Sequence, residues 1–160
     1  MKYIINIIRL ILIVIIAAYG STIRLIILLF TGSTDKCINT AVYLFSNGGM
    51  FVCGAKFEKY GNQDREKSPG KIYISNHESH LDPPAVSLAC SHPLYYIAKK
   101  EMKYVTFIGW YIWLTGMIFI DRKNKTKSQE SIKIAGEKVK NGKNVISFAE
   151  GTRSKTGELM

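Results

Sequence analysis

Cysteine and acidic residues are scarce in this chain of 160 residues, and each shortage narrows the class of protein. The three cysteines, Cys37, Cys53 and Cys90, are odd in number, widely spaced and free of any Cys-x-x-Cys pair. Neither a disulfide framework nor a cysteine zinc site is indicated, and a reducing compartment is the simpler interpretation. Only 12 acidic residues oppose 22 basic ones, and such an excess suits anionic partners. No recognisable nucleic-acid-binding motif accompanies the basic residues, so no nucleic-acid partner is expected.

The first thirty residues lack acidic side chains and form a long apolar run. Residues 3–30 are mostly Ile, Leu, Val and Ala, interrupted by Arg9, by residues 20–22 and by Arg24. A helix of that length would measure about 42 Å, more than the roughly 30 Å of a bilayer's hydrocarbon core. We therefore expect residues 1–57 to form an apolar, helical, membrane-associating segment.

Several arrangements of this run stay open. A single spanning helix would send Arg9 and Arg24 to opposite interfaces, whereas a break at Gly20 would give two shorter helices in one leaflet. The run could also be a cleaved signal peptide or a buried helix of a soluble core. After the run, a helix toward Phe45 is expected to end at the glycines of residues 48–49, and residues 51–57 are expected to form a short strand.

Residues 58–160 alternate between strand-like and helix-like patterns, which predicts an α/β domain with a mixed sheet and flanking helices. In such sheets ligands usually gather beyond the carboxyl ends of the strands. Charged motifs follow three of the expected strands. The strands are expected at residues 71–75, 94–98, 116–122 and 143–148, with helices at 85–89 and 128–140, the latter with Ile132, Ala135 and Val139 on one side.

His77 and Asp82 follow the first of these strands. Five positions correspond to about 500° around a helix, so the two side chains can meet only if the chain turns between them. An imidazole held by a carboxylate suits a general base for a hydroxyl nucleophile. Three other interpretations stay open: Asp82 as the N-cap of a helix that begins at Pro83, a metal site that includes His80, and Ser79 as a nucleophile.

Two arginines follow later strands, Arg122 after the third and Arg153 after the fourth. Both could converge on one anion, because the planar guanidinium is suited to holding phosphate. Gly151 allows close approach of the backbone, and Thr152 adds a hydroxyl donor. Glu150 could position a substrate hydroxyl or pair with Arg153.

Three blocks in this order, residues 76–83, 116–122 and 148–154, resemble those of the glycerolipid acyltransferases. Residues 98–101 resemble the stretch before the second block. The resemblance implies transfer of a fatty acyl group from acyl-carrier protein or acyl-CoA to the free hydroxyl of lysophosphatidate, in phospholipid synthesis at a membrane. It implies His77 as the base and Asp82 as its orienter. It also implies a phosphate-holding side made of Arg122, Glu150, Gly151, Thr152 and Arg153.

No metal and no bound cofactor are implied, and the catalytic domain is expected on the cytoplasmic side of the membrane. Glycerol-3-phosphate or another lysolipid is an alternative acceptor, and a non-catalytic, basic module that binds membrane phospholipid is the alternative from a different class. The chain departs from the family's pattern at Thr106 and Ala149, where proline is usual. It also stops at Met160, before the family's fourth block, so the domain is expected to be incomplete at its C-terminus.

Overall fold

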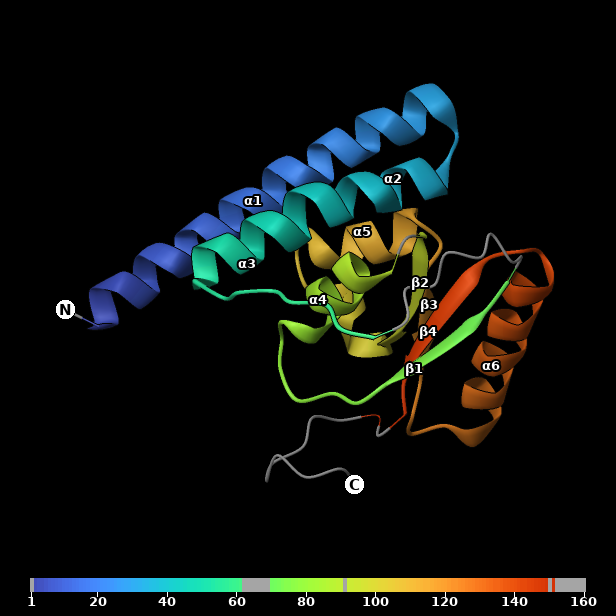
Figure 1. Ribbon diagram of the computed structural model, residues 1–160. Coiled ribbons are helices and arrows are strands. Elements are labelled where there is room, and N and C mark those ends of the chain that lie inside the picture. Colours follow the sequence, from blue (N-terminus) through green and yellow to red (C-terminus); the bar gives the residue numbers. More distant parts are fainter. Residues whose placement is uncertain (1, 62–69, 91, 150, 152–160) are drawn as a thin grey trace.

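The computed structural model describes residues 2–61, 70–90, 92–149 and 151 (Figure 1). Helices and strands alternate after an all-helical start. In chain order the elements are α1 (Lys2–Thr31), α2 (Thr34–Ala41), the π-helical turn η1 (Val42–Ser46), α3 (Asn47–Cys53), β1 (Ile72–Ser75), α4 (Asp82–Ala89), β2 (Leu94–Lys99), the 3₁₀ helix η2 (Lys100–Tyr104), α5 (Ile108–Leu114), β3 (Ile118–Ile120), α6 (Lys125–Lys140) and β4 (Asn144–Phe148).

The four described strands form one sheet in the order β1-β4-β2-β3. Every pairing among them is parallel, with Ser75 opposite Phe148, Tyr96 opposite Ile146 and Ala98 opposite Phe119. The α/β class and the flanking helices are confirmed, although no antiparallel pair of a mixed sheet occurs among these strands. Because all four run the same way, their carboxyl ends meet at one edge.

The sheet is enclosed by helices on both faces (Figure 1). Helix α6 packs across β3 and β4, and α4 is tied to β2 on the opposite face through Tyr96, whose hydroxyl donates to the carbonyl of Pro83. One buried cluster joins α2, α5, α6 and three of the strands. Its members are Ile38, Tyr95, Ile112, Met117, Ile118, Ala135 and Val145.

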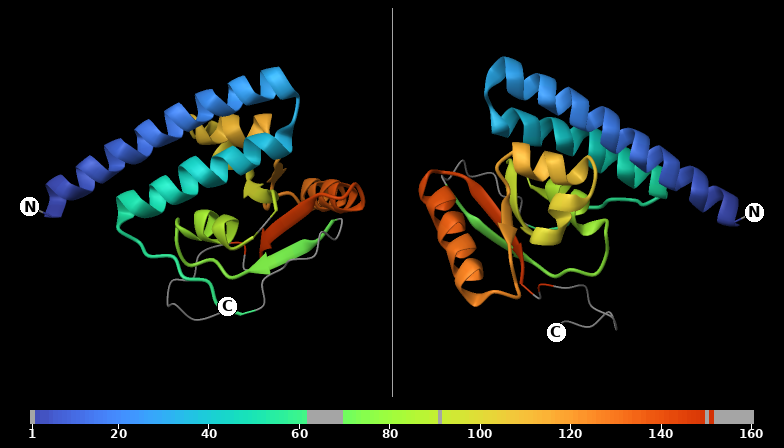
Figure 2. Two further views of the ribbon diagram at one scale, coloured as in Figure 1. Left: turned by 45° about the horizontal axis from the view of Figure 1, so that its top comes forward. Right: turned by 180° about the vertical axis from the view of Figure 1, so that it is seen from behind.

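The N-terminal helices form a hairpin in which α1 runs beside α2, η1 and α3 (Figure 2). The expected strand at residues 51–57 is wrong, because α3 continues to Cys53 and ends at Gly54 in the left-handed conformation, with φ of 68°. Residues 48–49 do not end the helix either. A Cβ on Gly48 would lie 3.4 Å from Ile16 of α1, so a glycine here permits the close approach of two helices. Contact with α1 therefore keeps the residues of α3 helical, although their local sequence favours a helix end followed by a strand.

Helix α1 is long and apolar enough to cross a membrane, which is compatible with membrane association. It is continuous through Gly20, so the alternative of two shorter helices broken at Gly20 is wrong. Its N-terminal half projects beyond the rest of the molecule and is exposed (Figure 1). Arg24, further along the helix, is buried against Tyr111 of α5, with only 6% of its surface exposed.

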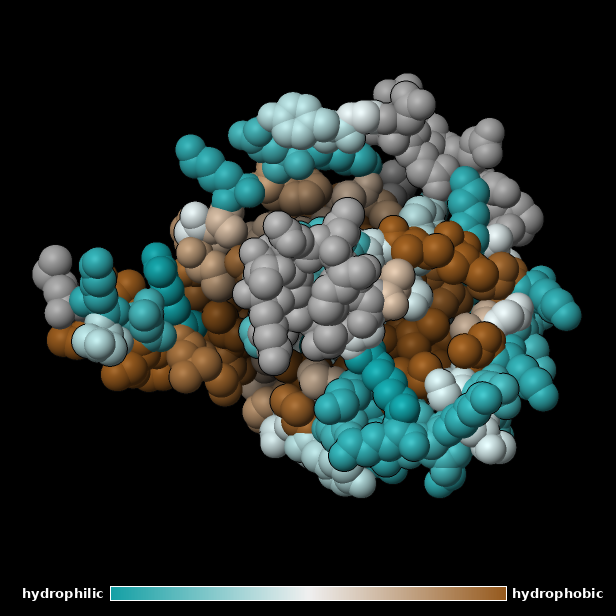
Figure 3. Space-filling view, turned by 90° about the horizontal axis from the view of Figure 1, so that it is seen from below, coloured by the Kyte–Doolittle hydropathy of each residue, from teal (hydrophilic) through white to brown (hydrophobic). Residues whose placement is uncertain are grey.

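Helix α6 differs from its expected pattern. Ser131 and Ala135 are its buried residues, whereas Ile132 is 58% exposed. The hydroxyl of Ser131 donates to the carbonyl of Phe119, which explains how a polar residue can face the sheet. Ile72 and Ile74 on the edge strand β1 are also exposed. Seen from below, hydrophobic side chains gather next to hydrophilic ones on this face of the molecule (Figure 3).

Candidate active site

The chain leaves the carboxyl end of β1 and turns sharply before α4. Its turn is held by the Asp82 carboxylate, whose Oδ2 accepts hydrogen bonds from the backbone N–H of Glu78 at 2.6 Å and of Ser79 at 2.7 Å. Helix α4 begins at Asp82 with Leu81 as its N-cap, and both prolines fall in its first turn. The N-cap interpretation of Asp82 is therefore wrong, because the carboxylate accepts from residues that precede it.

The same oxygen of Asp82 lies 2.8 Å from Nδ1 of His77. Burial raises the pKa of the Asp82 carboxyl, but hydrogen bonds from Ser79, His77 and Glu78 outweigh burial, so this pKa lies below its usual value. An ionised carboxylate only accepts, so Nδ1 carries a proton and Nε2 is the nitrogen available for proton transfer. Both side chains keep a small exposed fraction, 21% for His77 and 24% for Asp82. The sequence-predicted pair is thus brought together as a base and its orienter would be.

The ring of His77 stacks on the ring of Phe148, the last residue of β4, with the two centroids 4.3 Å apart and the planes 22° from parallel. Phe148 also lies beside Tyr96 of β2, at 6.2 Å between ring centroids. The sequence block 148–154 includes Phe148, but no site role was predicted for it or for Tyr96. The position of Phe148 at the end of a predicted strand was the available signal, but its contact with His77 depends on the parallel pairing of β1 and β4.

Arg122 and Gly151 also meet at this edge of the sheet. Gly151 has φ of 67°, and a Cβ added to it would lie 3.3 Å from Nη1 of Arg122, so the guanidinium lies close over its backbone. Glu150, Thr152 and Arg153, the other predicted members of the phosphate-holding side, fall outside the described residues. Two nearby positions of the chain therefore reach these groups: Phe148 at the end of β4 contacts His77, and Gly151, three positions further along, lies close to Arg122.

The neighbouring carboxylate of Asp121 is already paired. Its Oδ2 lies 2.6 Å from Nζ of Lys100, and this hydrogen bond lowers the pKa of Asp121. Arg122 is exposed, and no ion pair joins it to a carboxylate among the described residues. An anion near Gly151 would thus meet a guanidinium that has no carboxylate partner in that part of the chain. Within the same residues, no group of three or more His, Cys, Asp or Glu side chains is placed to hold a metal ion.

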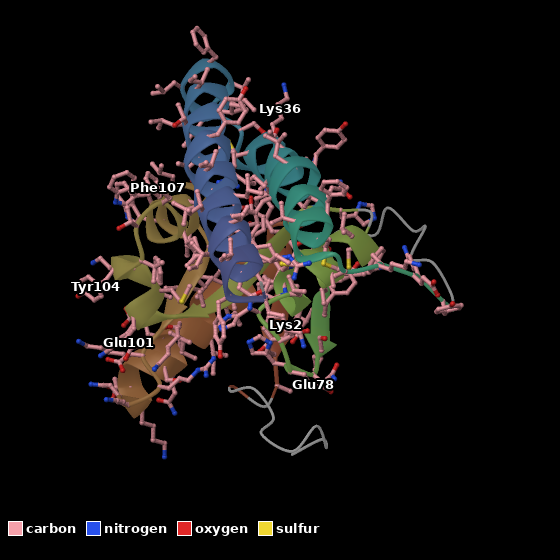
Figure 4. All side chains as sticks on the ribbon, turned by 90° about the vertical axis from the view of Figure 1, so that its left-hand side faces the viewer. Lys2, Lys36, Glu78, Glu101, Tyr104 and Phe107 are labelled. Carbon is pink, nitrogen blue, oxygen red and sulfur yellow. The ribbon has the colours of Figure 1, made fainter. Side chains whose placement is uncertain are left out.

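Figure 4 relates this edge to the rest of the molecule. Glu78, next to His77, lies at the opposite end from Lys36, which follows the turn between α1 and α2. The side chain of Asn76 donates to Glu78 at 2.8 Å, which holds the loop before His77. Tyr104 and Phe107 lie along the flank formed by η2 and α5. Trp110 and Trp113 of α5 are exposed, so the face of α5 that carries them does not belong to the core.

The chain is thus an α/β protein with a histidine–aspartate pair at the carboxyl edge of its parallel sheet and an arginine against Gly151, which follows β4. The family model described as Acyltransferase matches residues 56–160. The chain belongs to the Acyltransferase family.

Similar proteins agree with this assignment. The chain is 31% identical over 148 residues to the 1-acyl-sn-glycerol-3-phosphate acyltransferase of Escherichia coli, covering 92% of this chain and 58% of that protein. It is 37% identical over 109 residues to the enzyme of the same name from Helicobacter pylori, covering 67% of this chain and 44% of that protein. The chain thus spans about half the length of these relatives.

The fold is also found in a solved structure. The crystal structure of the 1-acyl-sn-glycerophosphate (LPA) acyltransferase PlsC from Thermotoga maritima matches 100% of this chain and 66% of its own, with a TM-score of 0.78 and 23% sequence identity. The whole described arrangement, including the N-terminal hairpin and the parallel sheet, is therefore a fold that this structure shares.

Proposed function

We propose that this chain transfers a fatty acyl group from an acyl thioester to the free hydroxyl of lysophosphatidate in phospholipid synthesis. The observation that carries the proposal is the contact of 2.8 Å between Nδ1 of His77 and Oδ2 of Asp82, at the carboxyl edge of the sheet. The relatives described above, which by name acylate 1-acyl-sn-glycerol-3-phosphate, support this choice of acceptor.

In the proposed reaction, Nε2 of His77 takes the proton of the acceptor hydroxyl as its oxygen attacks the thioester carbonyl. The carbonyl carbon becomes tetrahedral, and its bond to sulfur then breaks. The departing thiolate takes the proton back from the imidazolium, so the base is restored. Asp82 holds the imidazole in one tautomer and stabilises the charge that it carries between these two proton transfers.

The thioester is itself an activated acyl donor, so this chemistry requires neither a metal nor a bound cofactor. We assign the acceptor's phosphate to the side of Arg122 and Gly151, together with Glu150, Thr152 and Arg153. Arg122 supports this assignment, because its exposed guanidinium has no carboxylate partner among the described residues. Acyl-CoA and acyl-carrier protein are the two candidate donors.

The proposal locates the α/β domain on the cytoplasmic side of a membrane, where thioester donors are available. The exposed apolar residues of α1 would supply the contact with membrane phospholipid. Such a position brings the acceptor, which is itself a lipid, to the edge of the sheet without leaving the membrane surface.

The test is acyl transfer to radiolabelled lysophosphatidate in detergent micelles, with acyl-CoA and acyl-carrier protein as separate donors. His77→Ala and Asp82→Asn should each reduce transfer about 10²-fold or more. His92→Ala, which removes an imidazole beyond the other end of α4, is the matched control and should keep wild-type transfer. Undiminished transfer by His77→Ala would refute the proposed mechanism. Parallel assays with glycerol-3-phosphate and other lysolipids identify the acceptor.

A second candidate is a non-catalytic, basic module that binds membrane phospholipid. The formal net charge of +10 together with the exposed apolar face of α1 favours it. This candidate predicts binding to anionic vesicles that weakens with salt and in Arg122→Gln, with no thioester turnover by either donor.

A further inference from the structure

The hydrogen bond between His77 and Asp82 leaves one degree of freedom undetermined. It restrains the position of Nδ1, but the imidazole can still tilt about this contact through coupled rotations of the two side-chain torsions of His77. Such a rotation changes where Nε2 points, and Nε2 is the atom that must meet the acceptor hydroxyl in the proposed function. A second contact, on the face of the ring, is needed to set the ring plane.

Phe148 supplies a contact of this kind. Its ring lies 4.3 Å from the imidazole, centroid to centroid, and the two planes are only 22° from parallel. A flat ring against a flat ring resists rotation, because turning the imidazole would drive its edge into the phenyl carbons. The hydrogen bond and the stack together fix both the direction and the plane of His77.

Phe148 is itself held by β4 and by its neighbours. It ends β4 opposite Ser75 of β1, and the next backbone N–H, that of Ala149, donates to the carbonyl of Ser75 at 3.3 Å. The other neighbour is Tyr96, whose ring is tilted by 31° against the phenyl ring. Pairing of β4 with β1 thus fixes the backbone position of Phe148, and the Tyr96 ring restricts the rotation of the phenyl side chain.

Tyr96 connects this aromatic contact to helix α4. Its hydroxyl donates to the carbonyl of Pro83 at 2.7 Å and accepts from the hydroxyl of Ser87 at 2.7 Å. Burial raises the pKa of Tyr96, and this effect exceeds the opposing one of the Ser87 hydrogen bond, so its hydroxyl stays protonated and keeps donating. Pro83 directly follows Asp82. The hydrogen bond from Tyr96 to Pro83 therefore links the first turn of α4, which carries Asp82, to the Tyr96 ring beside Phe148.

We propose that Phe148 is a positioning residue for His77, which sets the plane of the imidazole so that Nε2 faces the acceptor hydroxyl. Phe148 acts through its contact with His77. The inference rests on the proposed function for its catalytic consequence, but the orientation of the ring is a property of the protein alone. The phenyl face also suits the imidazolium that forms during the reaction, because the face of an aromatic ring attracts a cation.

The first experiment measures the ring without any reaction. The Nδ1 proton that His77 donates to Asp82 is followed by nitrogen-edited NMR of the full chain in detergent micelles, and its signal is assigned by its loss in Asp82→Asn. Phe148→Leu keeps an apolar side chain but removes the flat face, so the signal should broaden and exchange faster with water. Phe148→Tyr retains the ring and should keep the wild-type signal.

The matched control is Phe119→Leu. Phe119 lies on β3, which is separated from β4 by β2, and its side chain packs against the core. This variant also replaces a half-buried phenylalanine on a strand, so it measures the general cost of losing such a ring. It should leave the Nδ1 signal of His77 unchanged, even where its melting temperature falls as much as that of Phe148→Leu.

The second experiment measures kcat and KM for acyl transfer. Phe148→Leu should lower kcat about 10- to 100-fold and leave KM for both substrates within about twofold, because misorientation affects the transition state and not binding. Phe148→Tyr should restore kcat, and Phe119→Leu should not lower it. A folded Phe148→Leu with wild-type kcat and an unchanged Nδ1 signal overturns the inference. If the wild-type chain itself transfers no acyl group, the proposed function fails, and the NMR comparison alone then decides whether Phe148 positions His77.

Discussion

The guanidinium carbon of Arg24 lies 4.1 Å from the centroid of the Tyr111 ring, which joins α1 to α5 in the interior. Nη2 of Arg24 also donates to the hydroxyl of Ser21, and that hydroxyl donates to the carbonyl of Phe107. A buried cation is costly unless its environment compensates, and here the face of the Tyr111 ring offsets part of that cost, while Nε of Arg24 has no hydrogen-bond partner among the described residues. The contact therefore holds the C-terminal half of α1 against the α/β domain.

Tyr111→Leu should lower the free energy of unfolding by about 2 kcal/mol, because Arg24 would lose the aromatic face that compensates its burial. The control is Tyr104→Leu, which removes a tyrosine that is 82% exposed and should change stability little. Thermal unfolding in one detergent, followed by circular dichroism, compares the two. Equal melting temperatures for both variants would show that the contact contributes nothing.

The glycines of α3 offer a matched pair. Gly49→Ala should stabilise the protein by about 0.5–1 kcal/mol, because a Cβ there meets nothing within 4 Å and alanine favours helix. Gly48→Leu should destabilise it, since the side chain would push against Ile16 and separate α3 from α1. Chemical unfolding of both variants measures the difference. A destabilised Gly49→Ala would contradict the described helix.

Acid should weaken the turn at Asp82. The pKa of this carboxyl is lower in the folded protein than its usual value. Its contribution to stability is therefore fully present above the unfolded value of about 4 and is lost as the pH falls through the lower folded value. Asp82→Asn should be less stable than wild type at pH 7, and the gap should shrink toward pH 3. Denaturant unfolding at several pH values measures it, and a gap that does not vary with pH would refute the linkage.

The two members of the pair should act as one unit in catalysis. If Asp82 works only by orienting His77, the double variant His77→Ala with Asp82→Asn should be no slower than His77→Ala alone. Acyl-transfer rates of the single and double variants complete the cycle. Fully multiplicative losses would mean that Asp82 contributes independently of His77.

Gly151→Ala should raise KM for lysophosphatidate, because the added methyl group would meet the Arg122 guanidinium at 3.3 Å and displace it. Gly32→Ala is the control for backbone strain alone, since Gly32 also has a positive φ, of 60°, but a Cβ there meets nothing within 4 Å. Both variants should lose about 1–2 kcal/mol of stability. Only Gly151→Ala should change the affinity for the acceptor, measured by initial rates over a range of its concentration.

The strands were predictable because each is a short run of β-branched and aromatic residues bounded by turn residues, and β1, β2, β3 and β4 all appear where expected. The His77–Asp82 contact was predictable because proline at the start of α4 forces the required turn. The strand expected at residues 51–57 failed because its local pattern is ambiguous and contact with α1 decides the outcome. The contact of Phe148 with His77 was not predicted because it arises from the order of the strands in the sheet, which no local sequence pattern contains.

Only two residues of the sequence separate Phe148, the last residue of β4, which stacks on the imidazole, from Gly151, which lies close to the Arg122 guanidinium. The proposed binding of the acceptor's phosphate and the proposed orientation of the imidazole would then depend on the same short segment. A substitution in this segment that changes phosphate binding would also change the orientation of the imidazole. A change of acceptor in evolution or in the laboratory would therefore have to keep the ring of Phe148 in place while it alters the residues that follow β4.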